Sequence, residues 1–314
     1  MNNTFVVSVI SPVFFALLCL CVFYAAAQKP FDNSVFTTVD DVRMHYRHWE
    51  KDLATARGSI VLIHGFGGST FSWQEVADSL NQLGYEVVAV DMPPFGYSDK
   101  THRINQSVTA HADRLHALLS QQLPGRTWHL AGHSMGGAVA QAYAICYPQH
   151  LVSVTFVAPA LFSALRISDK PVRNMLRLSP LRFFFGELAE EWFIREARLE
   201  RLLSSAYGVE PSREQVLGYL YPLTVPGTAR AILSAATFHE ELYELDASML
   251  SVPALAIWGT SDTWVPYASR EQALLRIPEV SLVLMEDVGH NPMETHLEEF
   301  MKHWLVFLDE HSSD

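Results

Sequence analysis

Short β-branched runs alternate with helical segments along most of this chain, and this rhythm limits its possible folds more than any other feature. Runs that are apolar on both faces are typical of strands buried in a parallel sheet whose connecting helices cover both sides. The predicted strands are Phe36–Val39, Val42–Trp49, Ser59–Ile63, Tyr85–Val90, Trp128–Ala131, Leu151–Ala158, Ala254–Trp258 and Ser281–Met285, the first two as a hairpin. The predicted helices are Trp73–Leu83, Val108–Gln121, Met135–Cys146 and about His296–Leu308. The sequence therefore predicts an α/β protein with a mostly parallel central sheet.

The alternation of strands and helices stops in the middle of the chain. Residues 161–249 contain helical segments but no clear buried strand, and the alternation resumes at Ala254. We interpret this stretch as a helical insertion between two sheet strands rather than as a separate domain. The predicted core therefore comprises residues 29–160 and 250–314.

The first 28 residues carry no charged side chain, and the apolar run from Phe5 to Ala27 is long enough to span a bilayer as a helix. One interpretation is a signal-anchor that remains attached. The other is a signal peptide cleaved near Gln28, after the small residues Ala25–Ala27. We expect a protein held at a membrane by this single segment, or exported if the segment is removed.

Composition excludes two classes of protein. With 49% hydrophobic residues the chain can bury a large core, so it is not intrinsically disordered. The net charge of -12 argues against a nucleic-acid-binding surface, which needs a net basic face. Cys146 is the one cysteine outside the apolar leader, and we expect it to be a buried, inert thiol.

The strongest chemical motif is Gly132-His133-Ser134-Met135-Gly136, which directly follows a predicted strand and precedes a helix. A serine nucleophile at such a turn needs glycine on both sides, because the turn is tight and its backbone is strained. Small residues after Gly136 allow the helix to approach the sheet. Ser134 is the predicted nucleophile.

A serine hydroxyl needs a base to remove its proton, and an acid to orient that base. In this arrangement the chain order is serine, acid, histidine. Asp262 follows one late strand and His290 follows the last one, so both loops reach the same end of a parallel sheet as Ser134. Asp287 is a rival acid, but it is too close in sequence to His290 to orient the ring across a loop.

The developing negative charge of an acyl-transfer transition state requires backbone N–H donors. The predicted donors are Met135, directly after the nucleophile, and Phe66 in His64-Gly65-Phe66-Gly67-Gly68. We interpret His64 as a structural residue rather than a second base.

Taken together, these motifs resemble those of the α/β-hydrolase superfamily, specifically its capped serine hydrolases. The resemblance also covers Asp91-Met92-Pro93-Pro94-Phe95-Gly96-Tyr97-Ser98, where Pro94 replaces the glycine common in the family. It implies an α/β-hydrolase fold in which residues 161–249 form a helical cap before the acid-bearing strand. Ser134 stands where dehalogenases and epoxide hydrolases carry aspartate, so those chemistries are not expected.

The resemblance implies a serine esterase or lipase-like enzyme that needs no cofactor, with a small-molecule or lipid ester as its substrate and apolar acyl chains preferred. Two alternatives use the same three residues, namely hydrolysis of a carbon–carbon bond in a β-diketone and cofactor-free perhydrolysis. A non-catalytic ligand-binding protein is a further alternative. No metal site is expected, because no two of His102, His111, His116 and His129 have helical zinc-site spacing. The candidate substrate contacts are His133, Trp192, Tyr219 and Phe238.

Overall fold

The computed structural model describes residues 29–101, 104–161, 194–235 and 245–312 of the chain. The chain divides into two units, Met1–Ser34 and Val35–Asp314. The second unit contains the predicted core from Val35 onward and the candidate site described below.

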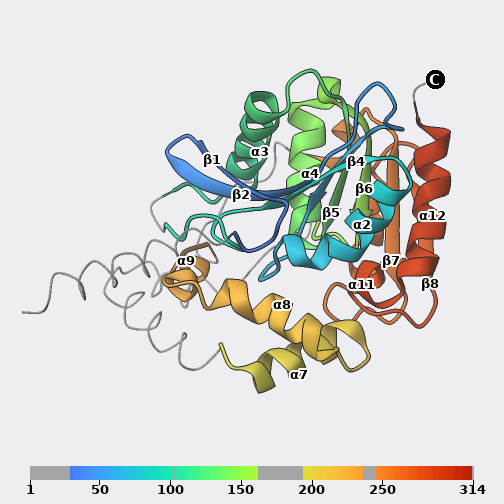
Figure 1. The fold of residues 1–314 in the computed structure, drawn as a ribbon. Coiled ribbons are helices and arrows are strands. Elements are labelled where there is room, and N and C mark those ends of the chain that lie inside the picture. The colour runs from blue at the N-terminus through green and yellow to red at the C-terminus, as the bar shows by residue number, and fades with distance from the viewer. Residues whose placement is uncertain (1–28, 102–103, 162–193, 236–244, 313–314) are drawn as a thin grey trace, which may run out of the picture. The chain divides into compact units, whose positions relative to one another are not determined.

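An eight-stranded sheet forms the centre of this unit (Figure 1). Its strands lie in the order β1-β2-β4-β3-β5-β6-β7-β8. Strand β2 is antiparallel to β4, whereas the six strands from β4 to β8 in the sheet order are parallel to one another. The strands are β1 (Ser34–Val39), β2 (Val42–Trp49), β3 (Ser59–Ile63), β4 (Glu86–Asp91), β5 (Trp128–His133), β6 (Leu151–Val157), β7 (Ala254–Gly259) and β8 (Ser281–Met285). The predicted α/β-hydrolase fold class, with its mostly parallel sheet, is confirmed.

Helices cover both faces of the sheet (Figure 1). On one face, α3 (Val108–Gln122) and α4 (Met135–Cys146) bury their apolar side chains against the strands in one core cluster. On the other face, α2 (Gln74–Gln82) and α12 (Leu297–Glu310) form a second cluster around Trp73 and Trp304. The central strands are apolar on both faces because each face packs against a helical layer. Two short helices, α10 (Glu271–Leu274) and α11 (Pro292–Thr295), follow β7 and β8.

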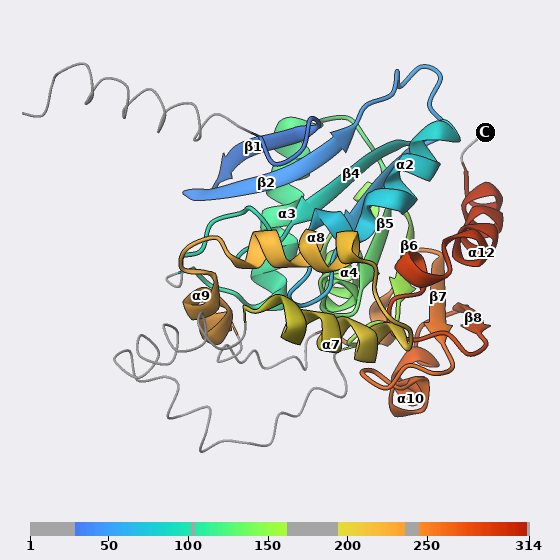
Figure 2. The ribbon, with the colours of Figure 1, turned by 60° about the horizontal axis from the view of Figure 1, so that its bottom comes forward.

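Three described helices lie between β6 and β7 in the sequence, namely α7 (Glu196–Tyr207), α8 (Arg213–Leu223) and α9 (Thr228–Ala235). Helices α7 and α8 lie beside each other (Figure 2) and share a small apolar cluster that includes Leu203, Val216 and Tyr219. A capping box formed by Ser212 and Gln215 starts α8. Phe71 of the short helix after β3 packs against this cluster, which brings α8 to the carboxyl ends of the parallel strands.

Several local predictions differ from the structure. The helix predicted from Trp73 is a 3-10 turn, Thr70–Trp73, followed by α2. Strand β5 continues to His133, two residues beyond its predicted end. The prediction of a buried Cys146 is wrong, because this residue is exposed at the end of α4, where the helix leaves the sheet.

Among the described residues, no helix has the length and apolar character needed to cross a membrane. The apolar leader, residues 1–28, lies outside the described residues.

Candidate active site

Ser134 occupies a strained turn between β5 and α4. Its backbone has φ 51° and ψ -116°, a conformation that L-residues other than glycine seldom adopt. The Ser134 N–H donates to the Val157 carbonyl at 2.9 Å, which ties the turn to β6. The side chain is only partly buried, so a substrate can reach it.

The small residues after Ser134 allow α4 to start against the sheet. A Cβ added to Gly136 would lie 2.5 Å from the Ile63 carbonyl oxygen and 2.6 Å from that of His64. Any larger residue would push the start of α4 away from β3. The glycine requirement inferred from the sequence therefore has a direct steric cause.

Asp262 and His290 form a buried pair. The Nδ1 of His290 lies 2.7 Å from Oδ2 of Asp262, and both residues are at most 4% exposed. The other carboxylate oxygen, Oδ1, accepts the amide N–H groups of Trp264 at 2.8 Å and Val265 at 2.9 Å. Because an ionised carboxylate only accepts hydrogen bonds, Nδ1 of His290 carries the proton, and Nε2 keeps its lone pair in the neutral ring.

His133, directly before the predicted nucleophile, connects Ser134 to the loop after β8 that carries His290, here called the histidine loop. Its Nε2–H donates to the His290 carbonyl at 3.0 Å, and the two rings lie 4.7 Å apart. Burial, reinforced by the neighbouring His290, holds the pKa of His133 well below its ordinary value, so this ring is neutral. The structure thus brings Asp262, His290 and the residue before Ser134 together at the carboxyl ends of β5, β7 and β8.

The glycine-rich loop after β3 passes beside Ser134. A Cβ added to Gly65 would lie 3.1 Å from the Cβ of Ser134. His64 uses both ring nitrogens on backbone groups, since Nδ1 donates to the Gly65 carbonyl at 2.7 Å and Nε2 accepts the Met92 N–H at 3.0 Å. It therefore has no free nitrogen to act as a base. Met135 is the first residue of α4, where an N–H has no acceptor within the helix and remains available to a ligand.

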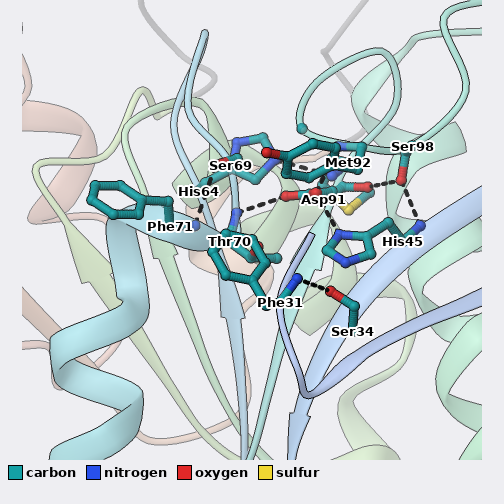
Figure 3. A network of polar contacts seen from close by, with 12 residues as sticks. Phe31, Ser34, His45, His64, Ser69, Thr70, Phe71, Asp91, Met92 and Ser98 are labelled. Atoms are coloured by element: carbon teal, nitrogen blue, oxygen red, sulfur yellow. Dashed lines mark hydrogen bonds and ion pairs between the residues drawn. The ribbon is translucent and has the colours of Figure 1, made fainter. Parts of the chain in front are cut away.

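Asp91, at the end of β4, holds this loop in place (Figure 3). Its carboxylate accepts the Thr70 N–H at 2.6 Å, the Tyr97 N–H at 2.8 Å and Nδ1 of His45 at 2.6 Å. Burial alone would raise the pKa of Asp91, but His45 with its hydrogen bond, His64 and the Tyr97 N–H together lower it. The ionised carboxylate therefore joins the loop after β3 to the loop after β4. In the sequence, Asp91 stands out only as the first residue of its motif.

Two of the four candidate substrate contacts, His133 and Tyr219, lie within the described residues. Tyr219 lies in α8 with its ring against Phe71, and its hydroxyl donates to Oε1 of Glu294 at 2.6 Å. The Nε2 of His133 is committed to the His290 carbonyl. Trp192 and Phe238 lie outside the described residues.

Glu294 forms a polar cluster that the sequence analysis missed. This residue of α11 accepts hydrogen bonds from the Tyr207 hydroxyl at 2.9 Å, the Tyr219 hydroxyl at 2.6 Å and the Asn291 amide at 2.7 Å. The two tyrosines come from α7 and α8, so the carboxyl group ties both helices to the segment that carries His290. Burial raises the pKa of Glu294 to about 7, against the lowering effect of these hydrogen bonds.

A Glu294→Gln variant is expected to change how stability depends on pH. A raised carboxyl pKa means that the native state binds more protons than the unfolded state between about pH 4.5 and 7. The wild-type free energy of unfolding should therefore fall as the pH rises through this window. Glutamine keeps the side-chain shape without titrating, so the variant should not show this fall in the free energy of unfolding. We expect a difference on the order of 1 to 2 kcal/mol, reduced by residual solvent contact.

Urea titrations of both proteins at pH 5 and pH 8 measure this difference, and the exposed Glu298→Gln serves as a control. Equal pH dependence in the wild type and Glu294→Gln would show that Glu294 does not titrate in this range.

Within the described ranges, no group of three histidine, cysteine or acidic side chains is placed to bind a metal ion. The Asp262–His290 pair lies beside the Ser134 turn, which also carries the Met135 N–H. This arrangement fits acyl transfer by a serine nucleophile.

Comparison with known proteins identifies the same fold. The family model described as "alpha/beta hydrolase fold" matches residues 58–297. Lipase 3 of Moraxella sp. (strain TA144) is 25% identical over 290 residues, which cover 91% of this chain and 87% of that protein. A 2-hydroxy-6-oxononadienedioate/2-hydroxy-6-oxononatrienedioate hydrolase of Burkholderia vietnamiensis is 26% identical, with coverage of 85% and 91%.

A solved structure shares the fold over almost the full chain. The crystal structure of a membrane phospholipase A, described as a novel bacterial virulence factor, superposes with a TM-score of 0.69. It is 24% identical, and the match covers 96% of this chain and 94% of that one.

Proposed function

The chain belongs to the alpha/beta hydrolase fold family and is a hydrolase. We propose that it cleaves carboxylic esters with Ser134 as the nucleophile. The observation that carries the proposal is the hydrogen bond between Asp262 and His290 beside the strained Ser134 turn. That bond leaves Nε2 of His290 free to accept a proton.

In the proposed reaction, Oγ of Ser134 attacks the ester carbonyl carbon while Nε2 of His290 accepts the Oγ proton. The carbonyl oxygen becomes an oxyanion that accepts hydrogen bonds from the Met135 and Phe66 N–H groups. The bond to the alcohol oxygen then breaks, and this oxygen takes the proton from His290. Water, deprotonated by the same histidine, attacks the acyl-enzyme, which releases the acid and restores Ser134.

We further propose that residues 161–249 form a cap that favours apolar acyl chains. Two observations support this substrate class: α7 and α8 share an apolar cluster, and one relative is named a lipase. A second candidate is hydrolysis of a carbon–carbon bond, because another relative of similar identity is a 2-hydroxy-6-oxononadienedioate hydrolase. Both reactions would use the same three side chains, so only substrate tests distinguish them.

A panel of p-nitrophenyl esters and monoacylglycerols of increasing chain length tests the proposal. Each buried methylene contributes about 0.8 kcal/mol, so kcat/KM should rise about fourfold per methylene until the pocket is full. Ser134→Ala, measured on the same panel, controls for hydrolysis that does not use this site. If no ester is cleaved while a β-diketone substrate is, the carbon–carbon reaction is the function.

We also propose that residues 1–28 anchor the enzyme to a membrane as an uncleaved segment. The length of the apolar run, Phe5 to Ala27, supports this proposal over cleavage. Mass spectrometry of the protein from its native host should find peptides that include Phe5. A mature N-terminus at Gln28 would instead indicate an exported protein.

A further inference from the structure

Trp264 lies against the imidazole ring of His290. The two rings are stacked, with centroids 5.8 Å apart and planes inclined by 25°. Trp264 is 47% exposed, whereas His290 is 2% exposed. The indole therefore covers the histidine while much of its own surface remains in water.

The turn that holds Asp262 also holds Trp264. The amide N–H of Trp264 donates to Oδ1 of Asp262 at 2.8 Å, and Oδ2 of the same carboxylate binds Nδ1 of His290. Two residues of one turn thus contact the imidazole in different ways. The carboxylate fixes the proton on Nδ1, and the indole contacts the ring.

The indole is itself held by α7. Its Nε1–H donates to Oγ of Ser205 at 3.2 Å. The neighbouring residue of α7, Ala206, accepts the His290 N–H through its carbonyl oxygen at 2.6 Å. The end of α7 therefore supports both members of the stacked pair.

We propose that Trp264 is a positioning residue for His290, and that its indole favours the imidazolium formed as His290 accepts the Ser134 proton. This inference rests on the proposed function. An aromatic face within about 6 Å attracts a cation, an interaction absent while the histidine is neutral. A contact that strengthens only as the positive charge develops raises kcat and leaves substrate binding almost unchanged. The stacked ring also restricts rotation of the imidazole away from Ser134.

Three variants separate the ring from its hydrogen bond. Trp264→Leu removes the aromatic face and should lower kcat about 3- to 30-fold, with KM changed less than about twofold. Trp264→Phe keeps an aromatic face but loses the Nε1 donor, and should restore kcat to within about threefold of the wild type. Ser205→Ala removes the same hydrogen bond from the α7 side and should behave like Trp264→Phe.

Kinetics on one p-nitrophenyl ester should be paired with the labelling rate of a fluorophosphonate probe, which also requires an activated serine. Circular dichroism corrects both rates for the folded fraction. The labelling rate of Trp264→Leu should fall by about the same factor as kcat.

Wild-type kcat in Trp264→Leu would overturn the inference. Equal losses in all three variants would also overturn it, because the hydrogen bond to Ser205 would then be responsible. A wild type that neither labels nor cleaves any ester would refute the proposed function, and the inference with it.

Discussion

An Asp262→Asn variant should fold like the wild type and lose about four orders of magnitude in kcat for ester hydrolysis. The structure explains why the replacement is so damaging. The N–H groups of Trp264 and Val265 both point at Oδ1, so the asparagine must place its carbonyl oxygen there. Its NH₂ group then faces Nδ1 of His290, which has to become an acceptor. The ring proton moves to Nε2, and the histidine can no longer accept the Ser134 proton.

Asp287→Asn is the matched control for this variant. Asp287 is three residues from His290 and exposed, with a backbone φ of 60° that asparagine tolerates as well as aspartate. Steady-state kinetics on one ester should show a kcat within about twofold of the wild type. The assignment of Asp262 as the acid would be wrong if Asp287→Asn lost activity and Asp262→Asn kept it.

Asp91→Ala should destabilise the fold by about 3 to 5 kcal/mol, because it removes the buried carboxylate that three donors share. The Thr70 and Tyr97 N–H groups and Nδ1 of His45 would each lose their carboxylate partner (Figure 3). An unpaired buried donor costs about 1 to 3 kcal/mol, and water entering the cavity would recover part of the loss. Urea denaturation measures the change in the free energy of unfolding.

Asp99→Ala, on the same loop, is the control. Asp99 accepts the exposed Arg43 N–H at 2.8 Å, so its loss should cost less than about 1 kcal/mol. Similar losses in the two variants would mean that burial of the Asp91 network adds nothing to stability. The kcat of folded Asp91→Ala should fall as well, because the carboxylate holds the loop that carries Phe66.

The sheet and the Ser134 turn were predictable because their signals are local. Apolar runs mark strands such as Ser59–Ile63, and glycines around Ser134 mark the turn. The order of Ser134, Asp262 and His290 then requires only that parallel strands end on one side. The burial of Cys146 depends on which face of its helix packs against the rest of the protein, and that prediction was wrong.

The networks around the site were not predictable because they join distant segments. His45 stands opposite Asp91 in the antiparallel pairing of β2 with β4, and the sequence contains nothing that pairs these strands. Glu294 is enclosed by tyrosines from α7 and α8, more than seventy residues away in the chain. The sequence around Trp264 is typical of an exposed turn. Only the folded structure shows that its indole stacks on the imidazole of His290.

The contact between the end of α7 and the histidine loop determines how the helices above the site can move. Gly289 packs so closely that an added Cβ would lie 2.5 Å from the carbonyl oxygens of Ala206 and Tyr207. The His290 N–H also donates to the Ala206 carbonyl. Any opening of α7 that leaves His290 in place must therefore pivot about the carboxyl end of this helix, with the largest displacement at Glu196. His290, the proposed base, therefore stays beside the fixed end of α7 during such an opening.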